Sequence, residues 1–183
     1  MSRLAALVLC LVGLAGCRGG AAPPQPASPP ADAGADAGGY ATGTVDAFRA
    51  SLFLAADPER FVAAVRAAGD AVELPVVSRA GRGEEIVAFV AVQDCSAGED
   101  GLCDVVVDFE LRDSSGELKA KQTDVGLWRD PPEPAPGAML FGEAALTLTI
   151  AADARPGTWK LTARVTDRAA ADTVTLRAAL QVE

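Results

Sequence analysis

Alternation of apolar and polar residues with a period of two constrains the fold of this chain more than any other feature. In residues 104–112, Val105, Val107 and Phe109 point to one side and Asp108 points to the other. This period is typical of a β-strand with one buried face and one face in solvent. The segments predicted as strands in this way are residues 104–112, 146–150, 158–166 and 173–182.

Further segments extend the β pattern. Residues 86–92 are apolar at every position, which predicts a central strand covered on both faces. Weaker strand signals occur at residues 48–54, 72–78 and 117–123. Turns containing glycine separate several of these runs, at residues 113–116 and 154–157.

A single helix is expected among the early strands. Asp57 can cap its N-terminus, Pro58 suits the first helical position, and Phe61 and Val65 lie on one face before a stop at Gly69. We expect this helix to cross over at one edge of the sheets and to pack against an open end of the sandwich.

Short strands separated by turns predict an all-β fold, a two-sheet antiparallel sandwich of about seven to nine strands with one short N-terminal helix. Residues 156–162 (PGTWKLT) and 164–167 (RVTD) resemble the penultimate strand of bacterial immunoglobulin-like and fibronectin-like domains. That resemblance implies an immunoglobulin-like sandwich. Residues 86–127 also resemble an uncharacterised group of proteobacterial envelope proteins, which implies no activity and no site residues.

The N-terminus has the layout of a secretory signal, with Arg3 before an apolar run. The run ends in Leu-Ala-Gly-Cys, which resembles the bacterial lipobox, so Cys17 is expected to carry lipid after removal of residues 1–16. An ordinary cleaved signal and an uncleaved anchor are the alternatives, and the small residues before Cys17 argue against both. Arg18 at the next position favours the outer membrane facing the periplasm, by resemblance to lipoprotein sorting in enteric bacteria.

The mature chain is expected to have two parts. Residues 17–39 are rich in Pro, Ala and Gly and predict a disordered tether, because they offer little apolar surface to bury. Residues 40–183 then form one immunoglobulin-like β-sandwich domain of ordinary size.

Two cysteines remain in the mature domain, Cys95 and Cys103, and we expect them to form a disulfide. A zinc site is the alternative, but two thiolates in a chain without histidine do not supply the usual four ligands. The spacing is also not that of a redox-active C-x-x-C pair.

Composition narrows the function. The chain has no histidine, which excludes histidine-based acid–base catalysis and Ser-His-Asp or Cys-His sites. Its net charge of −9 disfavours nucleic acid as a partner. No enzyme activity, cofactor or metal is expected, although a small two-carboxylate hydrolase is retained as an alternative.

Two loops are candidates for binding. In residues 93–104, Glu99, Asp100 and Asp104 are oxygen ligands of the type that calcium prefers, but their spacing favours a solvated acidic loop. In residues 126–137, Trp128 and Arg129 are of the types enriched at interface hot spots. Trp128 as a cap over the open edge of the core, and Arg129 in a surface pair with Asp130, are the alternatives.

The sequence therefore predicts a lipid-anchored envelope protein that acts as a non-catalytic binding or scaffolding module. Its expected partner is another envelope protein or a cell-wall polymer, besides the membrane reached through Cys17. A polysaccharide-binding accessory domain is the alternative, and an exposed aromatic platform on one sheet would favour it.

Overall fold

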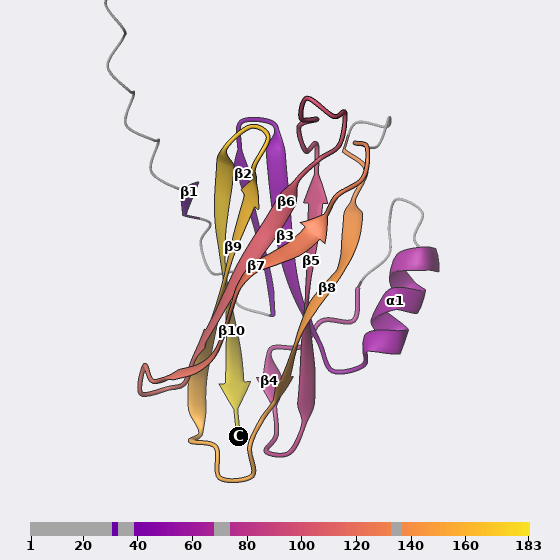
Figure 1. The fold of residues 1–183 in the computed structure, drawn as a ribbon. Helices are drawn as coiled ribbons and strands as arrows, with labels where there is room; N and C mark the ends of the chain where they lie inside the picture. The colour runs from indigo at the N-terminus through magenta and orange to yellow at the C-terminus, as the bar shows by residue number, and fades with distance from the viewer. Residues whose placement is uncertain (1–30, 33–38, 68–73, 133–136) are drawn as a thin grey trace, which may run out of the picture.

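Two β-sheets packed face to face make up the protein (Figure 1). The structure, a computed structural model, describes residues 31–32, 39–67, 74–132 and 137–183. The first sheet has the order β1 (Ala31–Asp32), β10 (Asp172–Val182), β9 (Gly157–Asp167), β6 (Val105–Arg112) and β7 (Leu118–Trp128), and β4 (Arg79–Ala80) also pairs with β10. The second sheet has the order β2 (Tyr40–Val45), β3 (Phe48–Ala55), β5 (Glu85–Gln93) and β8 (Leu140–Thr149).

The predicted fold class, an all-β two-sheet sandwich with one short helix, is confirmed. Neighbouring long strands pair antiparallel throughout, whereas the two-residue strands β1 and β4 pair parallel with β10. β1 lies in the part of the chain predicted as tether. No helix of the described residues is long and apolar enough to cross a membrane.

The main core lies between the sheets and consists of the inward residues of the alternating strands. In β9, buried Trp159, Leu161, Ala163 and Val165 alternate with polar residues that are exposed or half-buried. Burial on one face alone is what produces a period of two in the sequence. The alternation at residues 158–166 therefore identified both the strand and its inward face correctly.

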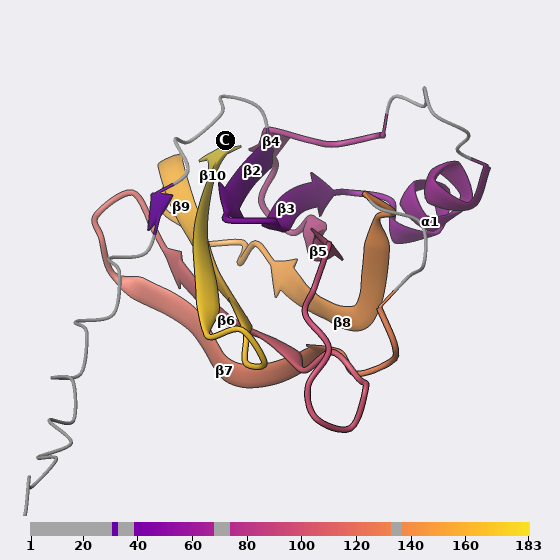
Figure 2. The ribbon, with the colours of Figure 1, turned by 90° about the horizontal axis from the view of Figure 1, so that it is seen from above.

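Strand β5 is covered on both faces, as its unbroken apolar run predicted. Ile86, Ala88 and Val90 belong to the core between the sheets. Phe89 and Ala91 belong to a second apolar cluster on the outer face of the second sheet. Helix α1 (Pro58–Ala67) covers that outer face (Figure 2).

Helix α1 begins as predicted but packs elsewhere than expected. The Asp57 side chain accepts a hydrogen bond from the backbone N–H of Arg60 at 2.8 Å, which caps the helix. The helix does not close an open end of the sandwich, because Phe61 inserts among Phe53, Phe89 and other rings of the second sheet. The predicted stop at Gly69 lies outside the described residues.

The prediction of a strand at residues 72–78 is wrong for residues 74–78, the part of this range that the structure describes. Residues 74–77 form no strand, and the following strand β4 is only two residues long. Pro75 has no backbone N–H to donate to a neighbouring strand. The backbone N–H of Val77 donates to the Leu54 carbonyl at 2.8 Å, but this contact does not extend into a strand. Strand β2, which the sequence did not predict, pairs with β3 instead.

Candidate functional site

The predicted binding residue Trp128 lies at the end of β7, where the two sheets meet at an edge. Its side chain is half-buried and packs against the main core, as expected for a cap over the open edge of the core. Its indole Nε1 is buried and has no hydrogen-bond partner among the described residues. Such an unsatisfied donor is rare in proteins and calls for an explanation.

Gly142 of β8 brings the second sheet against β7 at this point. A Cβ atom at this position would lie 1.9 Å from the carbonyl oxygen of Leu127, so only glycine allows the approach. The preceding residue, Phe141, consequently lines the same cavities as Trp128.

A groove of three adjoining cavities runs between α1 and the second sheet to Trp128; we call it the α1 groove. The middle cavity has a volume of about 460 Å³ and aromatic walls formed by Phe61, Phe89, Trp128 and Phe141. A cavity of about 530 Å³ on one side shares Phe89 with it, and one of about 470 Å³ on the other side shares Trp128 and Phe141. Mostly apolar pockets of this size with a few polar groups are typical of ligand sites.

The space lies beside a helix that has a single fully buried residue among those described. Phe61 is the buried residue of the helix, with its ring stacked on Phe89 at 4.5 Å. Val65 is half-buried and packs against the same cluster as Phe61, and both Val65 and the half-buried Val62 line the groove. An apolar strip of the helix is therefore left facing the cavity.

Arg66 supplies the charge in the middle of the α1 groove. It lines both the middle cavity and the 530 Å³ cavity, and no carboxylate of the described residues pairs with it. No acidic side chain of the described residues lines the middle cavity. Glu59 and Glu85 lie farther along the groove, in the 530 Å³ cavity. The middle cavity thus has apolar walls, Arg66 without a carboxylate partner among the described residues, and the ring of Trp128, whose Nε1 is itself covered.

The second predicted binding residue, Arg129, faces the acidic loop. Its guanidinium lies 3.8 Å from Asp104 and 4.0 Å from Asp100, and these two carboxylates, not the Asp130 of the alternative interpretation, are its ion-pair partners. Asp104 also faces Arg168, whose guanidinium contacts Asp124. Such exposed pairs contribute at most about 1 kcal/mol each.

The acidic loop therefore has arginines as its neighbours. Glu99, Asp100, Asp104, Arg129 and Arg168 line a hollow of about 340 Å³. Among the described residues, no cluster of three or more metal-ligating side chains is present. This arrangement favours the solvated acidic loop over a calcium site.

The Cys95–Cys103 disulfide is confirmed, with its Cα atoms 6.0 Å apart and both residues buried. It also holds the loop that follows Trp128. The Cys103 backbone N–H donates to the Asp130 carbonyl at 3.0 Å, and the Gly137 N–H donates to Asp94 at 2.9 Å. The disulfide-bonded loop and the neighbouring Asp94 thus hold Asp130 and Gly137 in place.

Three carboxylates gather where β9 turns into β10. Burial, followed by the charges of Asp46 and Asp167, raises the pKa of Asp172. Asp167 is buried and accepts hydrogen bonds from the backbone N–H groups of Ser96 at 2.7 Å and Ala169 at 3.0 Å. These bonds give Asp167 the structural role of joining the disulfide-bonded loop to β9. The cavities described above are lined by other residues.

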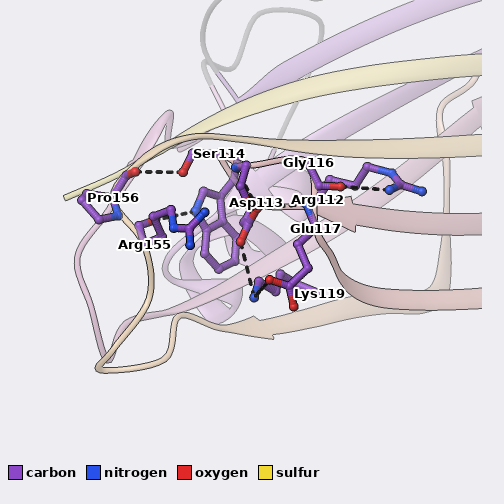
Figure 3. A network of polar contacts seen from close by, with 10 residues as sticks. Arg112, Asp113, Ser114, Gly116, Glu117, Lys119, Arg155 and Pro156 are labelled. Carbon is purple, nitrogen blue, oxygen red and sulfur yellow. Dashed lines mark hydrogen bonds and ion pairs between the residues drawn. The ribbon is translucent and has the colours of Figure 1, made fainter.

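The opposite end of the sandwich is closed by a polar network around Asp113 (Figure 3). The carboxylate accepts hydrogen bonds from the Ser115 hydroxyl at 2.6 Å and the backbone N–H of Glu117 at 3.0 Å, and faces Lys119 at 3.4 Å. These contacts, with Ser115 foremost, hold the pKa of Asp113 well below its usual range. Here the indole N–H of Trp159 donates to the Arg155 carbonyl, in contrast to that of Trp128.

Aromatic side chains do not form a surface platform. None of the described aromatic residues is exposed; Phe141, Phe89 and Trp128 are half-buried along the α1 groove. Sugar binding on a flat aromatic face therefore gains no support. The residues that sequence reasoning missed are Arg66 and Phe141, which come together with Trp128 only through the packing of α1 and β8.

Comparison with known proteins finds no matching family and no matching characterised protein. Among solved structures, a family 123 glycoside hydrolase from Clostridium perfringens is similar over 72% of this chain and 27% of its own, with 10% identity and a TM-score of 0.41. An alkylpurine DNA glycosylase from Pseudomonas fluorescens is similar over 58% of this chain and 27% of its own, with 14% identity and a TM-score of 0.37. A CARDB domain from Pyrococcus furiosus matches 58% of this chain and 80% of its own, with 16% identity and a TM-score of 0.35. The chain thus spans about a quarter of the two enzymes, and likeness at this level carries no argument for function.

Proposed function

We propose that the protein is a lipid-anchored envelope protein acting as a non-catalytic binding module, and that the α1 groove is its binding surface. The lipobox-like sequence ending in Cys17 supports the anchor, and Arg18 supports the outer membrane. The anchor would keep the domain at the membrane, where a ligand or partner of the envelope can reach the groove.

The observation that carries this proposal is the pair of unpartnered donors in an apolar cavity. A buried indole N–H without an acceptor costs about 1–3 kcal/mol, which a folded protein rarely retains without a use. Trp128 and Arg66 border the same cavity of about 460 Å³, and both lack an acceptor among the described residues. A bound partner that supplies acceptors explains why this edge is left unsatisfied, whereas Trp159 at the other end is satisfied.

Crosslinking in intact cells tests this surface. A photo-crosslinking amino acid is placed at Met139, which lines the groove and is 42% exposed, or at Leu118, which is 43% exposed and lies at the other end of β7. We expect an adduct, identified by mass, at position 139 and none at position 118. No adduct at 139, or the same adducts at both positions, would show that the groove is not the binding surface.

A further inference from the structure

We infer that the α1 groove takes a single-chain amphiphile, an extended apolar chain with one anionic head group. The inference rests on the proposed function and names the class of ligand for the same site. Three features of the groove lead to it: its length, the apolar walls of its middle cavity, and Arg66, which has no carboxylate partner among the described residues.

The length and lining of the groove suit an extended chain better than a compact ligand. Two adjoining cavities follow α1 from the Glu85 side to Trp128, and a third, which is lined by Arg129 and Asp130 and by no residue of α1, continues past Phe141. The side chains facing the middle cavity are almost all aliphatic or aromatic, including Val62 and Val65 of the helix. An acyl chain laid along this strip would remove their exposed apolar surface from water, which is the main favourable term in such binding.

The head group is assigned by charge complementarity. The chain as a whole carries a net charge of −9, and Arg79, Arg112, Arg129 and Arg168 each face a carboxylate. Arg66 has no such partner among the described residues, although it borders the middle cavity. Arg66 is exposed, and its guanidinium can pair with a carboxylate or phosphate through charge-assisted hydrogen bonds.

Trp128 lines the middle cavity and serves as a natural fluorescent reporter. Its unpartnered Nε1 is covered in this structure, so an acceptor reaches it only when neighbouring side chains shift on binding. Trp128 pairs with Val105 at the start of β6. The other tryptophan, Trp159, lies at the far end of β6, one residue beyond the pair formed by Lys160 and Arg112. With about 3.3 Å per residue, the two indoles are separated by roughly 25 Å. A quencher in the groove therefore affects Trp128 alone.

The experiment measures quenching of tryptophan fluorescence by an ω-bromo fatty acid and by the corresponding ω-bromo alcohol. The full chain carries Cys17→Ser, so that no acyl chain of its own competes, and is compared with the further variants Arg66→Gln and Arg60→Gln. Arg60 is the matched control, because it is exposed on the same helix and does not line the groove. Displacement of the acid by an alkyl phosphate, in a separate arm, distinguishes a carboxylate from a phosphate head group.

We expect saturable quenching, with the acid bound about threefold more tightly than the alcohol, equivalent to about 0.7 kcal/mol, because the pairing is with an exposed guanidinium. Arg66→Gln should abolish this preference and Arg60→Gln should keep it. Equal affinities for acid and alcohol, or a preference that survives Arg66→Gln, would overturn the anionic head group. Absence of quenching together with an adduct at Met139 would overturn the ligand class but leave the binding surface standing; absence of both would remove the proposed function as well.

Discussion

Truncation of Phe61 to alanine should release helix α1 from the sandwich. Phe61 is 1% exposed, and its ring centre lies 4.5 Å from that of Phe89 and 5.5 Å from that of Phe53. Removing a buried phenylalanine side chain costs about 3–5 kcal/mol. The lower end, about 3 kcal/mol, applies here because the cluster lies on the outer face of a sheet, where its neighbours can close over the space. A helix of ten residues has little stability of its own, so the loss should appear chiefly in α1.

The assay combines urea and thermal unfolding with amide hydrogen exchange. For a chain of this size, a loss of 3 kcal/mol lowers Tm by about 6–12 °C. Exchange of the amides in Pro58–Ala67 should accelerate, while exchange in β6 and β9 stays slow, because their core lies on the other side of the second sheet. Arg60→Ala is the control on the exposed face and should change stability by less than about 0.5 kcal/mol. A cost below about 1 kcal/mol for Phe61→Ala, with unchanged exchange in the helix, would refute the reasoning.

Three further predictions concern the disulfide, the Asp113 network and the anchor. Replacing Cys95 and Cys103 together by alanine should lower the free energy of unfolding by about 2.5 kcal/mol, because the disulfide closes a loop with a sequence separation of 8 and so restricts the unfolded chain. Urea unfolding measures this loss, and a loss near zero would contradict the prediction. Because folding lowers the pKa of Asp113, its carboxylate stabilises the folded state at pH values above the ordinary pKa of 3.8. This stabilisation is lost as the pH falls below 3.8 toward the folded-state pKa. Asp113→Asn should therefore be less stable than the wild type at pH 7 and should approach it in acid, whereas a constant difference from pH 7 down to pH 2 would speak against the network. Labelling cells with a radioactive fatty acid should mark the wild type but not Cys17→Ser, and equal labelling of the two would rule out lipid at Cys17.

The sequence was a good guide wherever one face of a strand is buried and the other is in solvent. Residues 158–166 show this, since Trp159, Leu161 and Val165 all point into the core of the observed β9. Strand β2 escaped prediction because, of its residues, only Ala41 is buried, so no apolar period arises. Strand β7 was predicted too short because it is an edge strand, exposed along most of its length. Its pairing is set by β6, and local alternation carries little of that information.

The α1 groove could be predicted only in part. Trp128 and Arg129 were selected by residue type, and the structure places only Trp128 in the middle cavity. Arg66 and Phe141 join it because α1 lies flat on the second sheet, a packing that the apolar pattern of the helix does not specify. A helix with apolar residues at positions 61, 62 and 65 fits an open end of the sandwich as well as an outer face. A local signal was Gly142, since a glycine inside a strand often marks a close approach of another backbone, although Gly126 in β7 shows that it does not always do so.

That close approach leads to a last prediction, for Gly142→Ala. The added Cβ would lie 1.9 Å from the Leu127 carbonyl oxygen, and since the obstacle is backbone, β7 and β8 must move apart. Such overpacking costs about 1–3 kcal/mol, and the shift displaces Phe141 from Trp128. Gly126→Ala on β7 is the matched control, because its Cβ would meet no atom within 4 Å. We expect Gly142→Ala to lower the free energy of unfolding and to shift the Trp128 emission, and Gly126→Ala to do neither. If both variants behaved like the wild type, the contact between β7 and β8 would not be what shapes the groove.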